Sequence, residues 1–180
     1  MKKLGQFTLT DKTIEKMRNK LKRNERVKRE LGFSLFQKNN MLIDRWHCTG
    51  SKGCISPSDK CINGEELVGG FHTHPDDNSD PSLGDMQNAY REGLECIGGF
   101  LDQKIVCYVR KDKFDKAHLD DISQAREKVV YLLNSKKAAE KDKSKYLTES
   151  RRLEIINEYK ETLRREKNRI LEKYFEVIEL

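Results

Sequence analysis

The chain has 180 residues, with 36 Lys or Arg against 30 Asp or Glu, a formal net charge of +6 and 36% hydrophobic residues. This length suits one domain with a sizeable core plus an extension. No apolar run approaches 18 residues, which excludes a membrane-spanning helix, and no apolar segment follows Met1-Lys2-Lys3, so we expect a cytoplasmic protein without a signal peptide.

The first 30 residues are the most basic part of the chain, with eleven Lys or Arg and four acidic residues. Gln6 to Leu9 predicts a short strand, and Asp11 begins a helix that Val27 and Leu31 continue, either directly or after a break at Asn24. Its apolar face is formed by Ile14, Met17 and Leu21. The basic face is either simply solvated or attractive to an acidic partner. Because no aromatic residue interleaves the basic run from 11 to 30, nucleic-acid binding is not expected.

A hairpin is predicted next. Leu31 to Gln37 and Met41 to Cys48 have the composition of strands, and Asn39-Asn40 between them is typical of a tight turn. A polar, glycine-containing loop follows and reaches Asn63.

The five cysteines fall into two groups. Without a secretory signal the default is reduced thiols, and Cys96 and Cys107, which lie in apolar stretches, are expected to be buried thiols. The loop contains Cys48, Cys54 and Cys61. Free thiols, a disulfide between two of them and a second zinc site with His47 all stay open there, although the five and six intervening residues depart from the short spacing of structural zinc sites.

The most informative stretch follows this loop. Glu66 to Phe71 is an apolar, glycine-containing segment typical of a buried strand, and it continues into His72 and His74. Residues two apart on a strand leave the same face, so both imidazoles are expected on one side of the sheet. Pro75 cannot donate to a strand ladder and is predicted to end the strand.

A helix is predicted from Ser82 to Gly93, and its first residues allow two interpretations. Ser-x-x-Asp before an apolar run is typical of a capping box, in which Ser82 and Asp85 only close the helix end. Alternatively, Asp85 joins the two histidines as a metal ligand, whereas the histidines alone would equally suit a plain surface pair. Two histidines and one carboxylate around tetrahedral Zn²⁺ leave a fourth position for water, which is the catalytic arrangement. The combined spacing favours zinc.

Two further strands are predicted at Cys96 to Leu101 and Ile105 to Arg110. Strands interspersed with helices predict an α/β (α+β) fold, with a central mixed β-sheet flanked by helices and the metal at one strand end.

The last third of the chain changes character, because residues 116 to 180 contain neither Gly nor Pro. Helices are predicted from Ala117 to Asn134 and from Leu147 onward. The second helix either packs on its own domain or forms a coiled coil with a second chain, which would make a homo-oligomer. We therefore expect an enzyme domain at 1–134 and a charged C-terminal helical extension at 135–180.

The pattern H-x-H-x7-S-x-x-D resembles the signature of the JAMM (MPN-plus) zinc metalloprotease family. This resemblance implies the MPN/JAMM-like fold, with a cytidine-deaminase-like layer arrangement, and zinc held by His72, His74 and Asp85. It also implies an oxyanion-donating role for Ser82. The activity that it implies is hydrolysis of the amide bond between a ubiquitin-like modifier and its target, with the modifier or its conjugate as partner.

The family also has an upstream glutamate. Glu30 to Leu35 resembles its E-x-G-x-x-L segment, which implies Glu30 as the general base, and Glu25 is the alternative. Phe33 departs from the pattern, because many members have a small residue there. A carboxylate in this role accepts a proton from the attacking water and returns it to the leaving amine.

Two other functions stay open. The chain is also consistent with a non-catalytic scaffold of the same fold that works through its C-terminal helices. It is likewise consistent with a zinc peptidase that cuts small peptides or cysteine-linked carriers.

Overall fold

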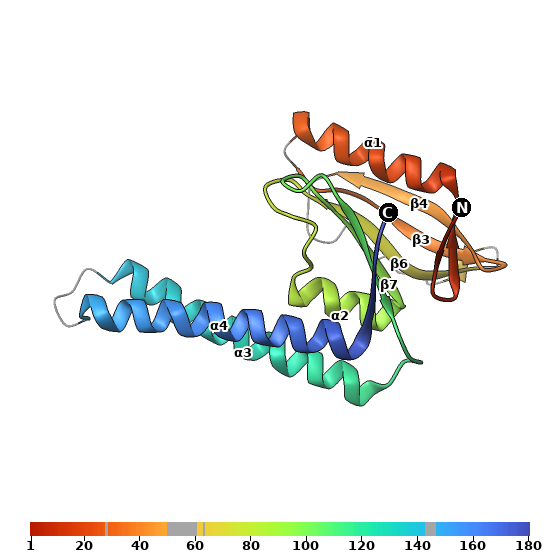
Figure 1. Ribbon diagram of the computed structural model, residues 1–180. Coiled ribbons are helices and arrows are strands. Elements are labelled where there is room, and N and C mark those ends of the chain that lie inside the picture. The colour runs from red at the N-terminus through yellow and green to blue at the C-terminus, as the bar shows by residue number, and fades with distance from the viewer. Residues whose placement is uncertain (28, 50–60, 63, 143–146) are drawn as a thin grey trace.

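The computed structural model describes residues 1–27, 29–49, 61–62, 64–142 and 147–180, and within them the chain forms one mixed β-sheet with helices on both faces (Figure 1). The helices are α1 (Asp11–Val27), α2 (Leu83–Glu92), α3 (Lys116–Lys141) and α4 (Glu149–Tyr174). The strands are β1 (Lys2–Leu4), β2 (Phe7–Leu9), β3 (Leu31–Lys38), β4 (Met41–Thr49), β5 (Cys61–Ile62), β6 (Glu65–His74), β7 (Leu94–Gly99), β8 (Ile105–Arg110) and β9 (Phe175–Glu179). Their order in the sheet is β1-β2-β4-β3-β6-β7-β8-β9, with β5 paired to β6. The predicted mixed sheet flanked by helices is confirmed.

Helix α1 covers one face of the sheet (Figure 1). The Thr10 side chain caps it by accepting from the backbone N–H of Thr13 at 3.1 Å. The predicted apolar face is buried against the sheet through Ile14, Met17 and Leu21. Helix α1 continues unbroken through Asn24 to Val27, as the continuation at Val27 predicts, whereas Leu31 already begins β3. The Asn24 side chain has a buried partner on the sheet.

The hairpin of β3 and β4 is also confirmed. Asn39 and Asn40 have φ values of 50° and 63°, and positive φ at both central residues is the geometry of a two-residue type I′ turn. Lys38 and Met41 are register partners across the turn. Cys54 lies outside the described residues, and so do the side chains of Cys48 and Cys61, so the three interpretations of that loop stay predictions.

The expectation of two buried free thiols in the core is wrong. Cys96 on β7 and Cys107 on β8 are direct partners in the antiparallel register, with Cα atoms 4.0 Å apart, and they form a disulfide. The pairing follows from strand register, which the separation of eleven residues does not reveal. Disulfides are uncommon in reducing compartments, so this pair does not support the expected cytoplasmic location.

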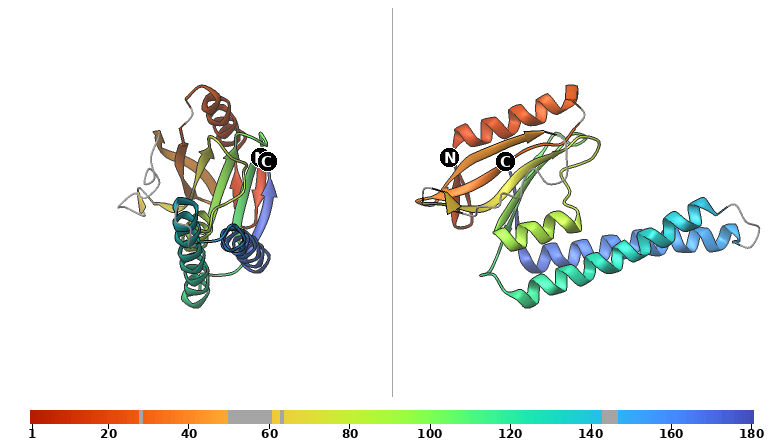
Figure 2. Two further views of the ribbon diagram at one scale, coloured as in Figure 1. Left: turned by 90° about the vertical axis from the view of Figure 1, so that its left-hand side faces the viewer. Right: turned by 180° about the vertical axis from the view of Figure 1, so that it is seen from behind.

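Helices α3 and α4 lie side by side as an antiparallel pair and extend well beyond the sheet (Figures 1 and 2). We call this pair the arm. Ion pairs join its helices, such as Lys128 to Glu166 at 3.1 Å. The domain boundary expected after Asn134 falls inside α3. No helix of the described residues is long and apolar enough to cross a membrane.

After the arm, the chain returns to the sheet. Strand β9 pairs with β8 in antiparallel register, from Arg110↔Phe175 to Val106↔Glu179. The sheet is so strongly curved that its first and last strands approach each other, and both chain ends lie together (Figure 2). At this closure Gly5 packs close to the Val109 side chain.

Candidate metal centre

Three predicted ligands converge where the carboxyl end of β6 meets the first turn of α2. The Nε2 atoms of His72 and His74 are 3.1 Å apart. The Asp85 Oδ1 atom lies 3.5 Å from Nε2 of His72, and Oδ2 lies 3.7 Å from Nε2 of His74. Ligands at zinc-bond lengths of about 2.0–2.2 Å around a tetrahedral ion are separated by roughly 3.3–3.5 Å. The two Asp85 distances involve different oxygens, and one ligand atom from each of the three side chains lies within 4.8 Å of the others. The three side chains could therefore hold a single divalent ion, whose identity their geometry leaves open.

The second nitrogen of each imidazole is also engaged. Nδ1 of His72 is 2.8 Å from Oε1 of Glu95, and Nδ1 of His74 is 3.1 Å from the carbonyl oxygen of Asn78. In the neutral form of each ring, both acceptors favour the tautomer with the proton on Nδ1, which leaves Nε2 free for a metal. Such partners orient metal-binding histidines in many proteins.

The loop between the ligands is fixed to the turn that follows β7. The Asp102 carboxylate accepts from the backbone N–H of Ser79 at 3.0 Å and from its hydroxyl at 2.6 Å. The Tyr108 hydroxyl donates to the Ser79 carbonyl at 2.9 Å. At Gly99 a Cβ atom would come within 2.1 Å of the Ser79 nitrogen, so only glycine allows this approach. The end of β7 and the turn after it therefore hold the loop that contains Asn78, whose carbonyl oxygen contacts Nδ1 of His74.

Asp85 caps helix α2, and its position is also compatible with the metal-binding role that the sequence posed as the alternative. Its Oδ2 atom accepts from the backbone N–H of Ser82 at 2.8 Å, while the Ser82 Oγ atom accepts from the backbone N–H of Asp85 at 3.2 Å. This is a complete capping box. The same carboxylate faces both histidines, so the cap aims the third ligand. The Ser82 hydroxyl is exposed and retains its own hydrogen for donation.

Glu30 lies immediately before β3 and is half-buried. The backbone N–H of the next residue, Leu31, donates to Oγ1 of Thr73 at 2.9 Å, and the Asn24 side chain donates to the same oxygen at 2.9 Å. Thr73 stands between the two histidines on β6, so the segment that carries Glu30 is tied directly to the ligand strand. The alternative base, Glu25, lies within α1, and its side chain is outside the described part.

Sequence reasoning missed Glu95 and Thr73. The signal for Glu95 was a lone carboxylate within the apolar strand Leu94–Gly99, all of whose residues are buried. A charge in such a strand needs a partner. Thr73 carried no comparable signal, because a threonine between two strand residues is ordinary.

The charge around His72 is negative. Burial alone would lower the pKa of His72, but the hydrogen bond and charge of Glu95, helped by Asp85 and Glu30, outweigh it and raise the pKa from 6.5 to about 9. Burial raises the pKa of Glu95, which the hydrogen bond from His72 opposes. A divalent cation would neutralise part of this excess negative charge.

Zinc affinity is expected to rise with pH. Below about pH 9 the metal-free His72 is protonated on Nε2, and zinc must displace that proton. The logarithm of the association constant should therefore increase by up to about one unit per pH unit between neutrality and pH 9, and then level off. Competition with a chelator of known affinity at several pH values measures this slope. An affinity that is flat over that range would contradict the expected protonation.

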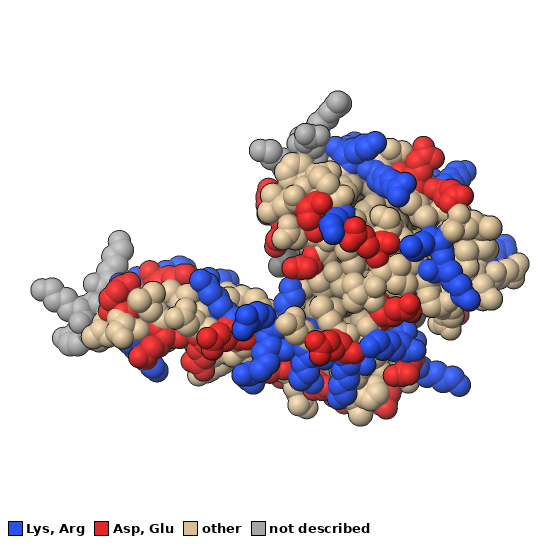
Figure 3. Space-filling view, in the orientation of Figure 1, with Lys and Arg blue, Asp and Glu red and all other residues tan. Residues whose placement is uncertain are grey.

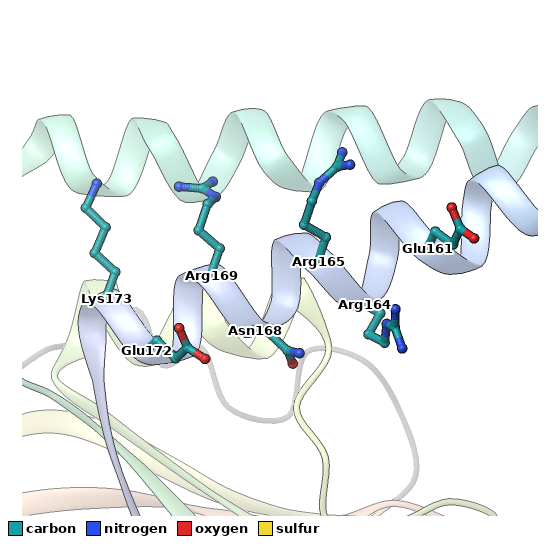
Figure 4. Close-up of a pocket in the computed structure, with 7 residues that line it drawn as sticks. All are labelled: Glu161, Arg164, Arg165, Asn168, Arg169, Glu172 and Lys173. Atoms are coloured by element: carbon teal, nitrogen blue, oxygen red, sulfur yellow. The ribbon is translucent and has the colours of Figure 1, made fainter.

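A separate open groove of about 840 Å³ lies on the arm, where it is lined by α4 residues alone (Figure 4). Arg165, Arg169 and Lys173 point to the side of α3, and there Arg169 binds Asp121 with two hydrogen bonds of 2.8 and 3.0 Å. None of the three metal-ligand candidates lines the groove. Arg169 and Lys173 both form ion pairs with Asp121 and so join α4 to α3.

Comparison with known proteins identifies no relative. Neither the scan against protein-family models nor the search of curated proteins finds a match. The motif and the geometry of the three ligands therefore carry the functional argument.

Proposed function

We propose that this chain is a zinc-dependent isopeptidase that hydrolyses the amide bond between a ubiquitin-like modifier and its target. The observation that carries the proposal is the convergence of His72, His74 and Asp85, whose candidate ligand atoms all lie within 4.8 Å of one another. Residue chemistry supports metal-assisted amide hydrolysis, and the motif's resemblance to JAMM proteases supports the MPN-like assignment and the substrate class.

In this proposal the chain's own residues position water and move its proton. Bound zinc would supply a Lewis acid that lowers the pKa of a bound water to about 7. Glu30 accepts a proton from the attacking water and returns it to the amine as the carbon–nitrogen bond breaks, which yields one carboxylate product and one amine. The Ser82 hydroxyl, whose lone pair already caps α2, donates its hydrogen to the developing oxyanion.

Two measurements on the purified protein test the proposal. Zinc content should be about one equivalent per chain, and lysine-linked or linear fusions of ubiquitin-like modifiers should be cut at the modifier's C-terminus. Cleavage of short peptides alone, with every fusion left intact, would replace the isopeptidase with the small-peptide peptidase. A protein that contains no zinc and takes none up would end the enzyme proposal.

Thr73 offers a prediction that separates the base from the ligands. Thr73→Val should leave zinc content unchanged but lower the turnover number, because the hydroxyl that holds the Leu31 N–H beside Glu30 is lost. A buried, unsatisfied N–H costs about 1–3 kcal/mol, so stability should fall as well. Thr73→Ser keeps the hydroxyl and should retain most activity. Equal activities for the valine and serine variants would show that this hydrogen bond does not position the base.

The arm favours a second candidate, a scaffold that associates through its helices. Val130, Tyr131 and Leu153 are 45%, 71% and 50% exposed on the arm, where acidic and basic side chains are interspersed (Figure 3). A homo-oligomer that buries these residues should sediment as more than one chain, and Tyr131→Glu should dissociate it. If the protein is a monomer at all concentrations, association of two chains through the arm is excluded. The zinc assay above distinguishes a pure scaffold from the enzyme.

A further inference from the structure

Glu95 is a charged residue in a buried position that disfavours charge. It is 5% exposed, in a strand whose other residues are Leu, Cys, Ile and Gly. Burial of a carboxylate is strongly unfavourable unless charge and hydrogen bonds compensate it. A merely structural strand gains nothing from such a residue, because apolar side chains would fill the same place more stably.

The side-chain hydrogen bond of Glu95 in the described structure goes to a single residue, His72. The parallel pairing of β6 with β7 sets this contact, because Glu95 is the register partner of Gly70. The imidazole of His72 leaves β6 two residues further along the same face. Since Gly70 has no side chain, the Glu95 carboxylate has room to reach Nδ1 of His72. The carboxylate contacts Nδ1, whereas the metal would bind Nε2, so Glu95 is not proposed as a fourth ligand.

The other charges near Glu95 do not explain its place. After His72, Asp85 and Glu92 have the largest electrostatic influence on Glu95, and both are acidic. Glu95 therefore adds negative charge to a region that is already negative. Such an arrangement is favourable when a cation occupies the centre, and a carboxylate hydrogen-bonded to a metal-binding histidine makes that histidine a stronger ligand.

We propose that Glu95 is a positioning residue that holds His72 with Nε2 toward the metal and strengthens zinc binding through its hydrogen bond to Nδ1. This inference rests on the proposed metal centre and extends it from three ligands to a carboxylate–histidine–metal relay. Loss of such a partner typically weakens metal affinity 10- to 100-fold.

The test measures the zinc dissociation constant by chelator competition and the visible spectrum of the Co²⁺-substituted protein, in Glu95→Gln and Glu95→Leu. Glu95→Gln keeps an acceptor of the same shape but loses the charge, and Glu95→Leu removes the acceptor. Zinc affinity should fall about 10-fold for the glutamine variant and toward 100-fold for leucine, and the Co²⁺ spectrum should change with the ligand field of His72. If the glutamine variant does not fold, the leucine variant serves alone, since apolar replacement of a buried charge is often tolerated.

Glu65→Gln is the matched control. Glu65 is also a buried glutamate with a cationic partner, because Arg45 donates to its carboxylate at 2.8 and 3.1 Å. It is no part of the metal centre, so its loss should lower stability without changing zinc affinity. Equal zinc affinity in Glu95→Leu and the unmodified protein would overturn the inference, and so would an equal loss in Glu65→Gln.

The outcome is separable from the proposed function. Zinc binding that depends on Glu95, without cleavage of any amide, would support the inference and defeat the isopeptidase. If loss of Glu95 changes neither zinc binding nor cleavage, the isopeptidase proposal is supported and the inference about Glu95 is overturned.

Discussion

Replacement of Asp85 by alanine should empty the metal centre and leave the fold standing. In the proposed metal centre the carboxylate supplies the third of three ligands, and its oxygens lie 3.5 and 3.7 Å from the two histidine Nε2 atoms. Two histidines alone hold zinc weakly, so we expect the zinc content to fall from about one equivalent to nearly none. The lost cap should cost only about 1 kcal/mol of unfolding free energy in the metal-free protein.

Ser82→Ala is the control for this prediction, because it breaks the same capping box from the other side. It should cost a similar stability and retain zinc. Elemental analysis of dialysed protein and denaturant unfolding of the metal-free form measure both quantities. If Asp85→Ala retains zinc as well as Ser82→Ala does, Asp85 is a cap and nothing more.

The second large effect is expected at Glu30. Glu30→Gln keeps the size and polarity of the side chain but removes its ability to accept a proton, so cleavage should slow by about 100- to 10,000-fold. Zinc content should not change, because Glu30 is not among the three grouped ligands. The measurement is the turnover number on a cleavable fusion, with zinc quantified in the same samples.

Glu15→Gln provides a matched control, since Glu15 is an exposed glutamate on α1 far along the chain from the ligands. It should cleave at the unmodified rate. Undiminished cleavage by Glu30→Gln would remove Glu30 from the mechanism and direct attention to Glu25, the alternative base.

Local patterns explain what the sequence could predict. The Asn39-Asn40 turn, the apolar face of α1 and the capping box at Ser82 depend on residues within a few positions of one another, and all three are present. The two histidines share a face because the strand period is two. The approach of the two histidines to Asp85 was also predictable, because it depends on a strand, a loop and a helix that follow one another in the sequence.

What the sequence could not predict depends on which strands become neighbours. Glu95 meets His72 only because β7 lies parallel to β6, and Cys96 meets Cys107 only through the register of β7 with β8. Strand register is a long-range outcome that no short window of sequence encodes. The same holds for Thr73, whose hydroxyl matters because Leu31 arrives beside it from 42 residues away.

The arm is not a C-terminal tail, because strand β9 follows it and returns to the sheet. Arg110 and Phe175, which flank the arm, are register partners on adjacent strands, and adjacent strands are about 4.8 Å apart. The two helices are thus an insertion within a hairpin, and the chain on both sides of the insertion belongs to the same sheet. Truncation from the C-terminus would strip an edge strand from the core before it shortened the arm, whereas internal excision with a short turn would remove the arm and spare the sheet.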